Sequence, residues 1–276
     1  MTRIAVLGGG KIGEALVAGL LESGRHARDL VVAEPRETRA KELANVYGIR
    51  TTGDIADAAE GADLLVVAVK PGDVDAVLTA IGDVELDRDR EQMLVSLVAG
   101  VPTNRYEPKL PAGFPVVRVM PNTPVLLGQG MCVIAAGRYA RAHHLELVTE
   151  VLGAVGKVAT VPESQMDAVT AVSGSGPAYF FLIAEAMIEA GVGLGLSHGV
   201  ATELVTQTMV GAAAMLDQTG QTASQLRAAV TSPGGTTAAA VRRLEQSAIR
   251  SAFIEALQAA KERSGQLGDE VEQSLM

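Results

Sequence analysis

The chain has 276 residues, of which 48% are hydrophobic, and it carries a formal net charge of −9. This length predicts about two domains, and the acidic charge argues against nucleic acid or an anionic membrane as a partner. The lone cysteine, Cys132, cannot form an intramolecular disulfide, which favours a reducing cytosol. The N-terminus shows no signal-peptide pattern, and no apolar run approaches the roughly 18 residues that span a bilayer. We therefore expect a soluble, cytoplasmic protein.

The first predicted strand runs into a glycine-rich turn. Ile4–Leu7 is fully apolar, as in a parallel strand that is covered on both faces. Gly8, Gly10 and Gly13 follow at the spacing of a dinucleotide fingerprint, and a helix is expected from there to about Leu21. In this fingerprint the first glycine makes a tight turn, the second admits a pyrophosphate, and the third packs the helix on the strand. The stretch therefore predicts a dinucleotide site at a helix N-terminus.

A second strand, Leu30–Ala33, leads directly into Glu34. An acid about 20 residues after the fingerprint commonly binds the ribose 2′-hydroxyl of NAD. Arg36 and Arg39 follow closely, and either guanidinium could pair with the 2′-phosphate of NADP. The residues alone leave the choice between the two cofactors open.

Three further apolar strands end in small or turn-forming residues. Residues 64–69 run into Lys70 and Pro71, while strands at 93–98 and 115–120 end in Ala-Gly and Pro-Asn-Thr-Pro. In open α/β sheets the carboxyl ends of the strands carry the ligand crevice. We therefore expect these strand ends on the cofactor side.

Two more strands are expected at residues 131–135 and 157–161, after which the alternation of strand and helix stops. Arg118 lies inside an apolar strand, which predicts a buried partner or a position at the rim. The expected fold class is α/β, with a Rossmann-type parallel sheet domain at residues 1–161 followed by an all-α domain at residues 162–276.

The helical half contains a glycine-rich turn, Ser173–Pro177, before an apolar helix. Such a turn can bind an anion, and a tight corner between helices is the alternative. The last helix, from about Ala248, is expected to end at Gly265. His143 and His144 stand among charged residues with no acid or cysteine at metal-ligand spacing, so we expect them at the surface and predict no metal.

A second informative stretch is Ser232-Pro233-Gly234-Gly235-Thr236-Thr237, which precedes a helix from Ala238. It combines backbone N–H donors with two hydroxyl groups, which suits a carboxylate. N-capping by Thr236 explains one threonine but not the two glycines. The stretch therefore predicts an anion site.

A dinucleotide domain followed by an anion-binding turn suggests hydride transfer to a small substrate that carries a carboxylate. No His or Cys stands where it would act as general acid. A ketone reductase must protonate the alkoxide that forms, whereas a cyclic imine can arrive already protonated. The pattern therefore favours a C=N substrate.

Several motifs in both halves resemble those of one family, the 1-pyrroline-5-carboxylate reductases. They are Leu226–Thr237 with Leu244 and Glu245, Ala168–Thr170 with Ser173–Tyr179, Ala68–Pro71, and Met120–Pro124. The resemblance covers essentially the whole chain. It implies reduction of 1-pyrroline-5-carboxylate to L-proline, the last step of proline biosynthesis, with NADPH (NADP) favoured as cofactor and NADH (NAD) as the alternative. It also implies a homodimer through the helical domain, which can assemble into a decamer.

The fingerprint and the resemblance together imply the site residues. The cofactor site would comprise Leu7, Gly8, Gly9, Gly10, Lys11, Ile12, Gly13, Glu34, Arg36, Asp54, Ala68, Val69, Lys70, Pro71, Leu97, Val98, Ala99 and Asn122. The substrate site would comprise Glu163, Ser232, Gly234, Gly235, Thr236 and Thr237. By the resemblance, Gly234, Gly235 and Thr236 hold the substrate carboxylate through backbone N–H groups. Thr237 hydrogen-bonds the ring nitrogen and is the nearest to a catalytic residue.

Two positions depart from the family pattern. Ala229 stands where some members carry an Asn that touches the substrate. Glu34 stands where many members carry Ser, Asn or Arg, which weighs against NADP unless Arg36 and Arg39 offset it.

Two alternatives from other classes stay open. One is a related NAD(P)-dependent imine or 3-hydroxyacid reductase, although no lysine lies between Lys157 and Lys261 to serve the hydroxyacid chemistry. The other is a dinucleotide-binding regulator without turnover.

Overall fold

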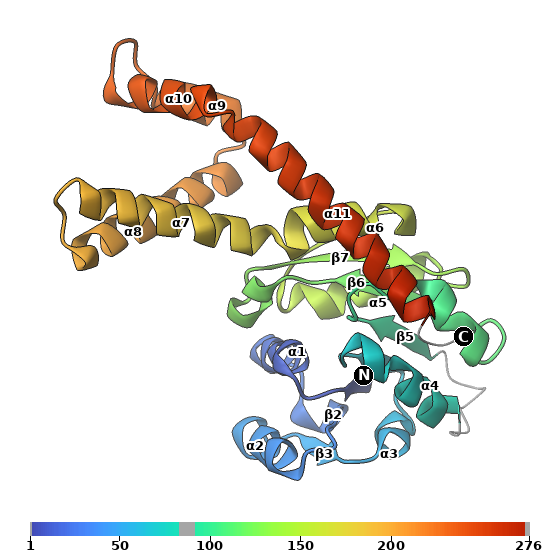
Figure 1. Cartoon of the computed structure of the whole chain (residues 1–276). Helices are drawn as coiled ribbons and strands as arrows, with labels where there is room; N and C mark the ends of the chain where they lie inside the picture. Colours follow the sequence, from blue (N-terminus) through green and yellow to red (C-terminus); the bar gives the residue numbers. More distant parts are fainter. Residues whose placement is uncertain (1, 83–91, 274–276) are drawn as a thin grey trace. The chain divides into compact units, whose positions relative to one another are not determined.

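The structure is a computed structural model that describes residues 2–82 and 92–273 (Figure 1). It divides into two compact units, Met1–Ser175 with Ala260–Met276, and Gly176–Ala259. The alternation of strand and helix ends at Thr160, close to the predicted point. The first unit continues beyond the expected boundary at residue 161, because Met166 packs in a buried cluster on the last strands of the sheet.

The first unit contains a sheet with the strand order β3-β2-β1-β4-β5-β6-β7-β8. The strands from β1 to β6 are parallel, β7 is antiparallel to β6, and β8 is parallel to β7. This is the doubly wound arrangement of a Rossmann fold with two added strands, as the sequence predicts. The bounds are β1 Ile4–Leu7, β2 Leu30–Ala33, β3 Arg50–Thr52, β4 Leu64–Val67, β5 Met93–Ser96, β6 Val116–Met120, β7 Gly130–Ala136 and β8 Gly156–Thr160.

Helices cover both faces of this sheet and create two separate cores. Val6 shares one core with Leu16, Leu43 and Val151 of α1, α2 and α5. Leu7, on the opposite side of the same strand, shares the other core with residues of α3 and α4. A strand that is buried on both faces has to be apolar throughout, which explains the unbroken runs in β1 and β4. The helices are α1 Lys11–Glu22, α2 Glu37–Tyr47, α3 Ile55–Ala59, α4 Val74–Gly82, α5 Ala142–Gly153 and α6 Met166–Val169.

The second unit is helical, and α7 packs against α8. Thr222 and Gln225 form a capping box at the start of α9, with each side chain accepting a backbone N–H. Ala248, with φ of 55°, separates α10 from α11. The bounds are α7 Gly176–Gly193, α8 His198–Gln218, α9 Ala223–Ala229, α10 Thr236–Gln246 and α11 Ile249–Gln273, of which the last returns to the first unit.

The predicted end of the last helix at Gly265 is wrong, because α11 runs on to Gln273. A glycine inside a helix costs only about 1 kcal/mol, so the helix can continue through Gly265. Close packing explains the next glycine of the helix, Gly268. A Cβ at Gly268 would lie 3.1 Å from the carbonyl oxygen of Gly100. The glycine therefore lets α11 approach the loop after β5.

Two further expectations about the helical half need correction. Ser173–Pro177 is not a turn with a free helix start, since Thr170–Gly174 is a π-helical turn and the Ser175 N–H donates to the Thr170 carbonyl at 2.8 Å. The helical stretch Glu163–Gly193 also passes a length and composition test for a membrane span, contrary to the expectation that none would. One such helix is weak evidence of a membrane span, since helices of soluble proteins can have the same length and composition.

His144 is buried, at 3% exposure, so its predicted surface position is wrong. The ring Nδ1 accepts a hydrogen bond from the backbone N–H of Arg141 at 2.8 Å and thereby closes the first turn of α5. His143 is exposed, as predicted. Of the two predicted settings for Arg118, a partner or a rim position, the structure shows the partner: Arg118 is buried at 6% exposure, and its guanidinium lies 3.5 Å from the Glu163 carboxylate.

Candidate functional site

Strands β1 and β4 lie side by side, and the chain leaves them toward opposite edges of the sheet. This is the topological switch point at which doubly wound sheets bind ligands. Gly8 adopts φ of +117°, and a Cβ there would lie 2.6 Å from the carbonyl oxygen of Ala68. A Cβ at Gly13 would lie 2.2 Å from the carbonyl oxygen of Gly8. Both positions therefore require glycine for the turn and for the packing of α1.

Gly10 is different, because a Cβ built there would meet no atom within 4 Å. Its glycine is explained neither by a positive φ nor by a close protein neighbour, and the space beside it is open. Gly10 is also the N-cap of α1, where N–H groups without helical partners gather. The glycine turn Gly8–Gly13, which we call the cradle, therefore fits the pyrophosphate of a dinucleotide, the group that the fingerprint predicts.

The other predicted cofactor residues follow strands along the same edge of the sheet. Because the strands from β1 to β6 are parallel, their carboxyl ends share that edge. Leu7 ends β1, and Gly9, Lys11 and Ile12 follow in the glycine turn and the start of α1; Glu34 and Arg36 follow β2, Asp54 follows β3, Ala68–Pro71 follow β4, Leu97–Ala99 follow β5, and Asn122 follows β6.

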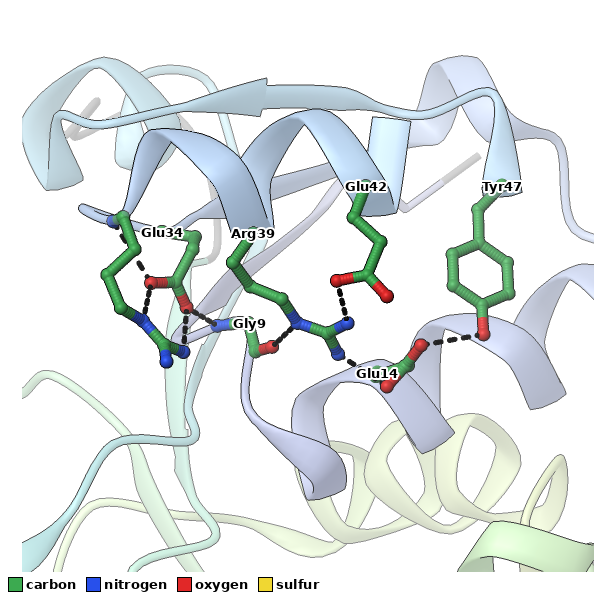
Figure 2. A network of polar contacts seen from close by, with 7 residues as sticks. Gly9, Glu14, Glu34, Arg39, Glu42 and Tyr47 are labelled. Carbon is green, nitrogen blue, oxygen red and sulfur yellow. Dashed lines mark hydrogen bonds and ion pairs between the residues drawn. The ribbon is translucent and has the colours of Figure 1, made fainter. Parts of the chain in front are cut away.

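Glu34 is buried at 4% exposure, although it is an acid at the edge of the sheet. Its Oε1 accepts from the N–H of Arg36 at 3.1 Å and from Arg36 Nε at 2.8 Å. Its Oε2 accepts from the N–H of Gly9 at 3.2 Å and from Arg36 Nη2 at 3.3 Å (Figure 2). Burial opposes ionisation, but the hydrogen bonds and charge of Arg36 and the Gly9 N–H outweigh it and lower the pKa of Glu34.

Arg39 holds the same glycine turn through the carbonyl group of Gly9, the residue whose N–H donates to Glu34. Its Nε donates to the carbonyl oxygen of Gly9 at 3.0 Å (Figure 2). Its terminal nitrogens reach Glu14 of α1 and Glu42 of α2, and Glu14 also accepts from the Tyr47 hydroxyl. The guanidinium is thus a brace between the turn and two helices.

The loop after β5 rests on a buried hydroxyl pair. The Ser96 hydroxyl lies 2.6 Å from the Tyr106 hydroxyl and accepts the N–H of Val98 at 3.2 Å. Burial raises the pKa of Tyr106 to about 12, more than the hydrogen bond to Ser96 lowers it. The Ser96–Tyr106 pair therefore holds the backbone of Leu97–Ala99 in place through the Val98 N–H.

Two predicted cofactor residues already have structural partners. The Asn122 amide accepts from the N–H of Met131 at 2.8 Å and donates to the carbonyl of Ser173 at 3.1 Å. The Asp54 carboxylate caps α3 by accepting from the N–H of Ala56 at 2.8 Å. Either residue can still contribute backbone atoms to a ligand.

Glu163, the predicted substrate residue of the first unit, has partners on a loop and on a strand. The carboxylate accepts from the N–H of Thr103 at 2.7 Å and from the Thr103 hydroxyl at 2.5 Å, and it pairs with Arg118. The Glu163 side chain is 28% exposed. Its carboxylate is therefore fixed in orientation while part of it faces outward.

In the second unit, the predicted anion turn leads into α10. Gly234 has φ of +74°, and Gly235 is the N-cap, with no side chain to satisfy the first N–H groups of the helix. The N–H of Gly235 donates to the carbonyl of Ser232 at 3.0 Å, so it is engaged within the turn. Thr236 and Thr237 are the first two residues of α10, so their N–H groups have no acceptor within the helix. The start of α10 can therefore hold an anion.

Sequence reasoning missed Ser96, Thr103 and Tyr106, which support the predicted residues. No local pattern marks them, because Thr103 and Glu163 are 60 positions apart and Ser96 and Tyr106 are separated by a loop. Within residues 2–82 and 92–273 no group of three or more His, Cys, Asp or Glu side chains is placed to hold a metal ion.

Comparison with known proteins finds one family model that matches the sheet region and another that matches the helical region. Residues 163–267 match the family model described as pyrroline-5-carboxylate reductase dimerisation. Residues 3–100 match that described as NADP oxidoreductase coenzyme F420-dependent. The chain is 53% identical to a pyrroline-5-carboxylate reductase of Mycobacterium tuberculosis, over 97% of each chain.

Solved structures also resemble this protein over the whole chain. One is a pyrroline-5-carboxylate reductase from Coxiella burnetii, with a TM-score of 0.92, 37% identity, and coverage of 96% of this chain and 98% of that one. The other is a Plasmodium falciparum pyrroline carboxylate reductase with NADP bound, with a TM-score of 0.83, 29% identity, and coverage of 97% and 98%. With its glycine cradle and its helical unit, the chain belongs to the pyrroline-5-carboxylate reductase family.

Proposed function

We propose that the chain reduces the C=N bond of 1-pyrroline-5-carboxylate to give L-proline, the last step of proline biosynthesis, with NADPH as the preferred hydride donor. The observation that carries the proposal is the glycine turn at the switch point, where Gly10 leaves open the space that a pyrophosphate needs. The NADP in the Plasmodium falciparum structure and the NADP oxidoreductase match support the choice of dinucleotide.

The dinucleotide supplies a hydride to the imine carbon when it is bound. In the first unit, the edge residues from Leu7 to Gly13 and those after β2, β3, β4, β5 and β6 hold and orient it. Asn122 and Asp54 contribute backbone atoms, since their side chains are engaged. The turn of Gly8 against Ala68 fixes the cradle before any ligand arrives, which reduces the entropy lost on binding.

The substrate carboxylate is held by the start of α10. The N–H groups of Gly234 and Thr236 are the donors that the resemblance assigns, and the adjoining Thr237 N–H of the helix start joins them. The N–H of Gly235, also assigned by the resemblance, instead orders the turn through Ser232. The Thr237 hydroxyl hydrogen-bonds the ring nitrogen. Because a protonated imine already carries the proton that the product amine keeps, no stronger acid is required. In the first unit, Glu163 is the residue that the resemblance assigns to the substrate, and Thr103 and Arg118 hold its carboxylate.

The chain acts as a homodimer formed through its helical region, residues 162–276, and it is a cytoplasmic protein. In α7 the side chains of Phe180, Phe181 and Leu182 are 61%, 67% and 66% exposed. An apolar surface of this kind marks an interface, and the matched dimerisation family supports a second copy as its partner. Association of five dimers into a decamer extends the same proposal. Light scattering after gel filtration measures both states.

The activity is tested by following NADPH and NADH oxidation by absorbance with 1-pyrroline-5-carboxylate as substrate. Rapid oxidation that depends on the substrate, with proline as product, is the expected result. Titration of each dinucleotide without substrate is run alongside. A chain that binds dinucleotide but oxidises none with this substrate would contradict the proposed reaction while leaving the cofactor site standing.

A further inference from the structure

The acid at the end of β2 does not have the environment of a ribose ligand. To accept ribose hydroxyls, a carboxylate has to offer open oxygen lone pairs. Both oxygens of Glu34 instead accept hydrogen bonds from Arg36, and one also accepts from the Gly9 N–H (Figure 2). The carboxylate is thus covered by a guanidinium.

Arg36 has a free side that faces away from this contact. It engages Glu34 through Nε and Nη2, which lie on one edge of the planar group, so Nη1 projects from the other edge. The Arg36 side chain is 68% exposed. A second anion can therefore bind the guanidinium without breaking the pair.

The other candidate cation is already fully engaged. Arg39 is 18% exposed, and its nitrogens bind the Gly9 carbonyl, Glu14 and Glu42. Of the two arginines that the sequence offered for a phosphate, Arg36 alone has an exposed guanidinium. It is also the N-cap of α2, whose positive end favours an anion.

We propose that Arg36 neutralises Glu34 and presents its free edge to the 2′-phosphate of NADPH, so that Glu34 positions Arg36 and does not bind the ribose. The inference rests on the proposed dinucleotide site. A lone carboxylate here would repel a 2′-phosphate, but the pair carries no net charge. The acid, which by position indicates NAD, thus becomes part of an NADP site.

The test is a double-mutant cycle with two ligands. Dissociation constants for NADPH and for NADH are measured by fluorescence titration on the wild type, Arg36→Gln, Glu34→Gln and the double variant. In Glu34→Gln the amide oxygen of the new side chain can still accept the Gly9 N–H, so the turn keeps that contact. Glu37→Gln is the matched control, because Glu37 lies on the first turn of α2 and pairs only with Lys41 among the described residues.

Arg36→Gln should weaken NADPH binding by about tenfold or more, since it removes the cation and uncovers the acid. NADH binding should stay unchanged or tighten. Glu34→Gln alone should not tighten NADPH and should not weaken NADH. In the Arg36→Gln background, however, Glu34→Gln should recover NADPH affinity severalfold. Removing the acid thus improves NADPH binding only when Arg36 is absent.

Selective loss of NADH affinity in Glu34→Gln, together with tighter NADPH binding, would overturn the inference and make Glu34 a ribose ligand. Equal effects of Arg36→Gln on both dinucleotides would overturn it as well. A wild type that binds neither dinucleotide would refute the proposed cofactor site itself. Thermal unfolding of each variant separates these results from a loss of fold.

Discussion

Glu163 accepts hydrogen bonds from both the backbone N–H and the hydroxyl of Thr103, at 2.7 and 2.5 Å. The same carboxylate lies 3.5 Å from the buried Arg118 guanidinium. Glu163→Ala should therefore lower the free energy of unfolding by about 1–3 kcal/mol, because it leaves a buried cation without its partner. Urea denaturation measures this change.

Glu163→Gln separates a structural role from a role toward the substrate. It keeps an oxygen for the Thr103 donors, so its stability should lie between those of the wild type and Glu163→Ala. If Glu163 also faces the substrate, the KM for 1-pyrroline-5-carboxylate should rise in Glu163→Gln while the KM for NADPH holds. An unchanged substrate KM in a stable Glu163→Gln protein would restrict the residue to its structural role.

Gly10 and Gly13 should respond in opposite ways to an added side chain. A Cβ at Gly10 meets no protein atom, so Gly10→Val should keep the fold and abolish NADPH binding by filling the cradle. A Cβ at Gly13 would lie 2.2 Å from the Gly8 carbonyl oxygen, so Gly13→Ala should cost about 1–3 kcal/mol of stability.

Thermal unfolding and NADPH titration of the two variants together give the comparison. Normal NADPH binding by Gly10→Val would show that the open space beside Gly10 does not hold the pyrophosphate. A fully stable Gly13→Ala protein would contradict the close packing of α1 on the turn.

The parts of this molecule that the sequence predicts are those with local causes. The apolar strands Ile4–Leu7 and Leu64–Val67 can be recognised because burial on both faces leaves no polar position. The glycine spacing is readable because Gly13 meets its constraint within the same turn, at the Gly8 carbonyl, while Gly10 leaves open the space that the fingerprint assigns to a pyrophosphate. The capping box of Thr222 is likewise contained in four residues.

What the sequence does not predict depends on contacts between distant segments. The spacing of Glu34 and Arg36 shows two opposite charges but not that the acid is buried and covered. His144 reads as a surface residue because its neighbours are charged, yet its ring bonds the backbone of Arg141. Gly265 resembles a helix end, and only the packing of α11 on Gly100 shows why the helix continues.

Thr237 and Thr236 offer a matched pair at the start of α10. Thr237→Ala removes the hydroxyl assigned to the ring nitrogen, and losing one hydrogen bond to a charged group costs roughly 1.5–3 kcal/mol. Turnover should therefore fall roughly 10- to 150-fold with NADPH affinity nearly unchanged. Thr236→Ala keeps the backbone N–H that is assigned to the carboxylate, so its turnover should stay within about threefold of the wild type.

Steady-state kinetics with both substrates varied, and NADPH titration, check this pair. An unchanged rate in Thr237→Ala would remove its assigned role. Equal losses in the two variants would instead point to a shared effect on the start of the helix.

Tyr106 should make the protein sensitive to alkaline pH. Burial raises the pKa of its phenol from 10.0 to about 12 in the folded protein. Between these values the unfolded chain releases the proton while the folded chain retains it, so stability is intact below pH 10 and falls as pH rises toward 12. The full shift corresponds to roughly 3 kcal/mol.

Tyr106→Phe removes this titration along with the bond to Ser96. At pH 8 it should be less stable than the wild type by about 1 kcal/mol. Above pH 10 its unfolding free energy should decline less steeply, so that the two curves, measured by urea unfolding from pH 8 to pH 11, converge or cross. Tyr139→Phe changes a phenol that is 39% exposed and should follow the wild-type decline. Parallel curves for the wild type and Tyr106→Phe would mean that the Tyr106 phenol ionises as easily in the folded protein as in the unfolded chain.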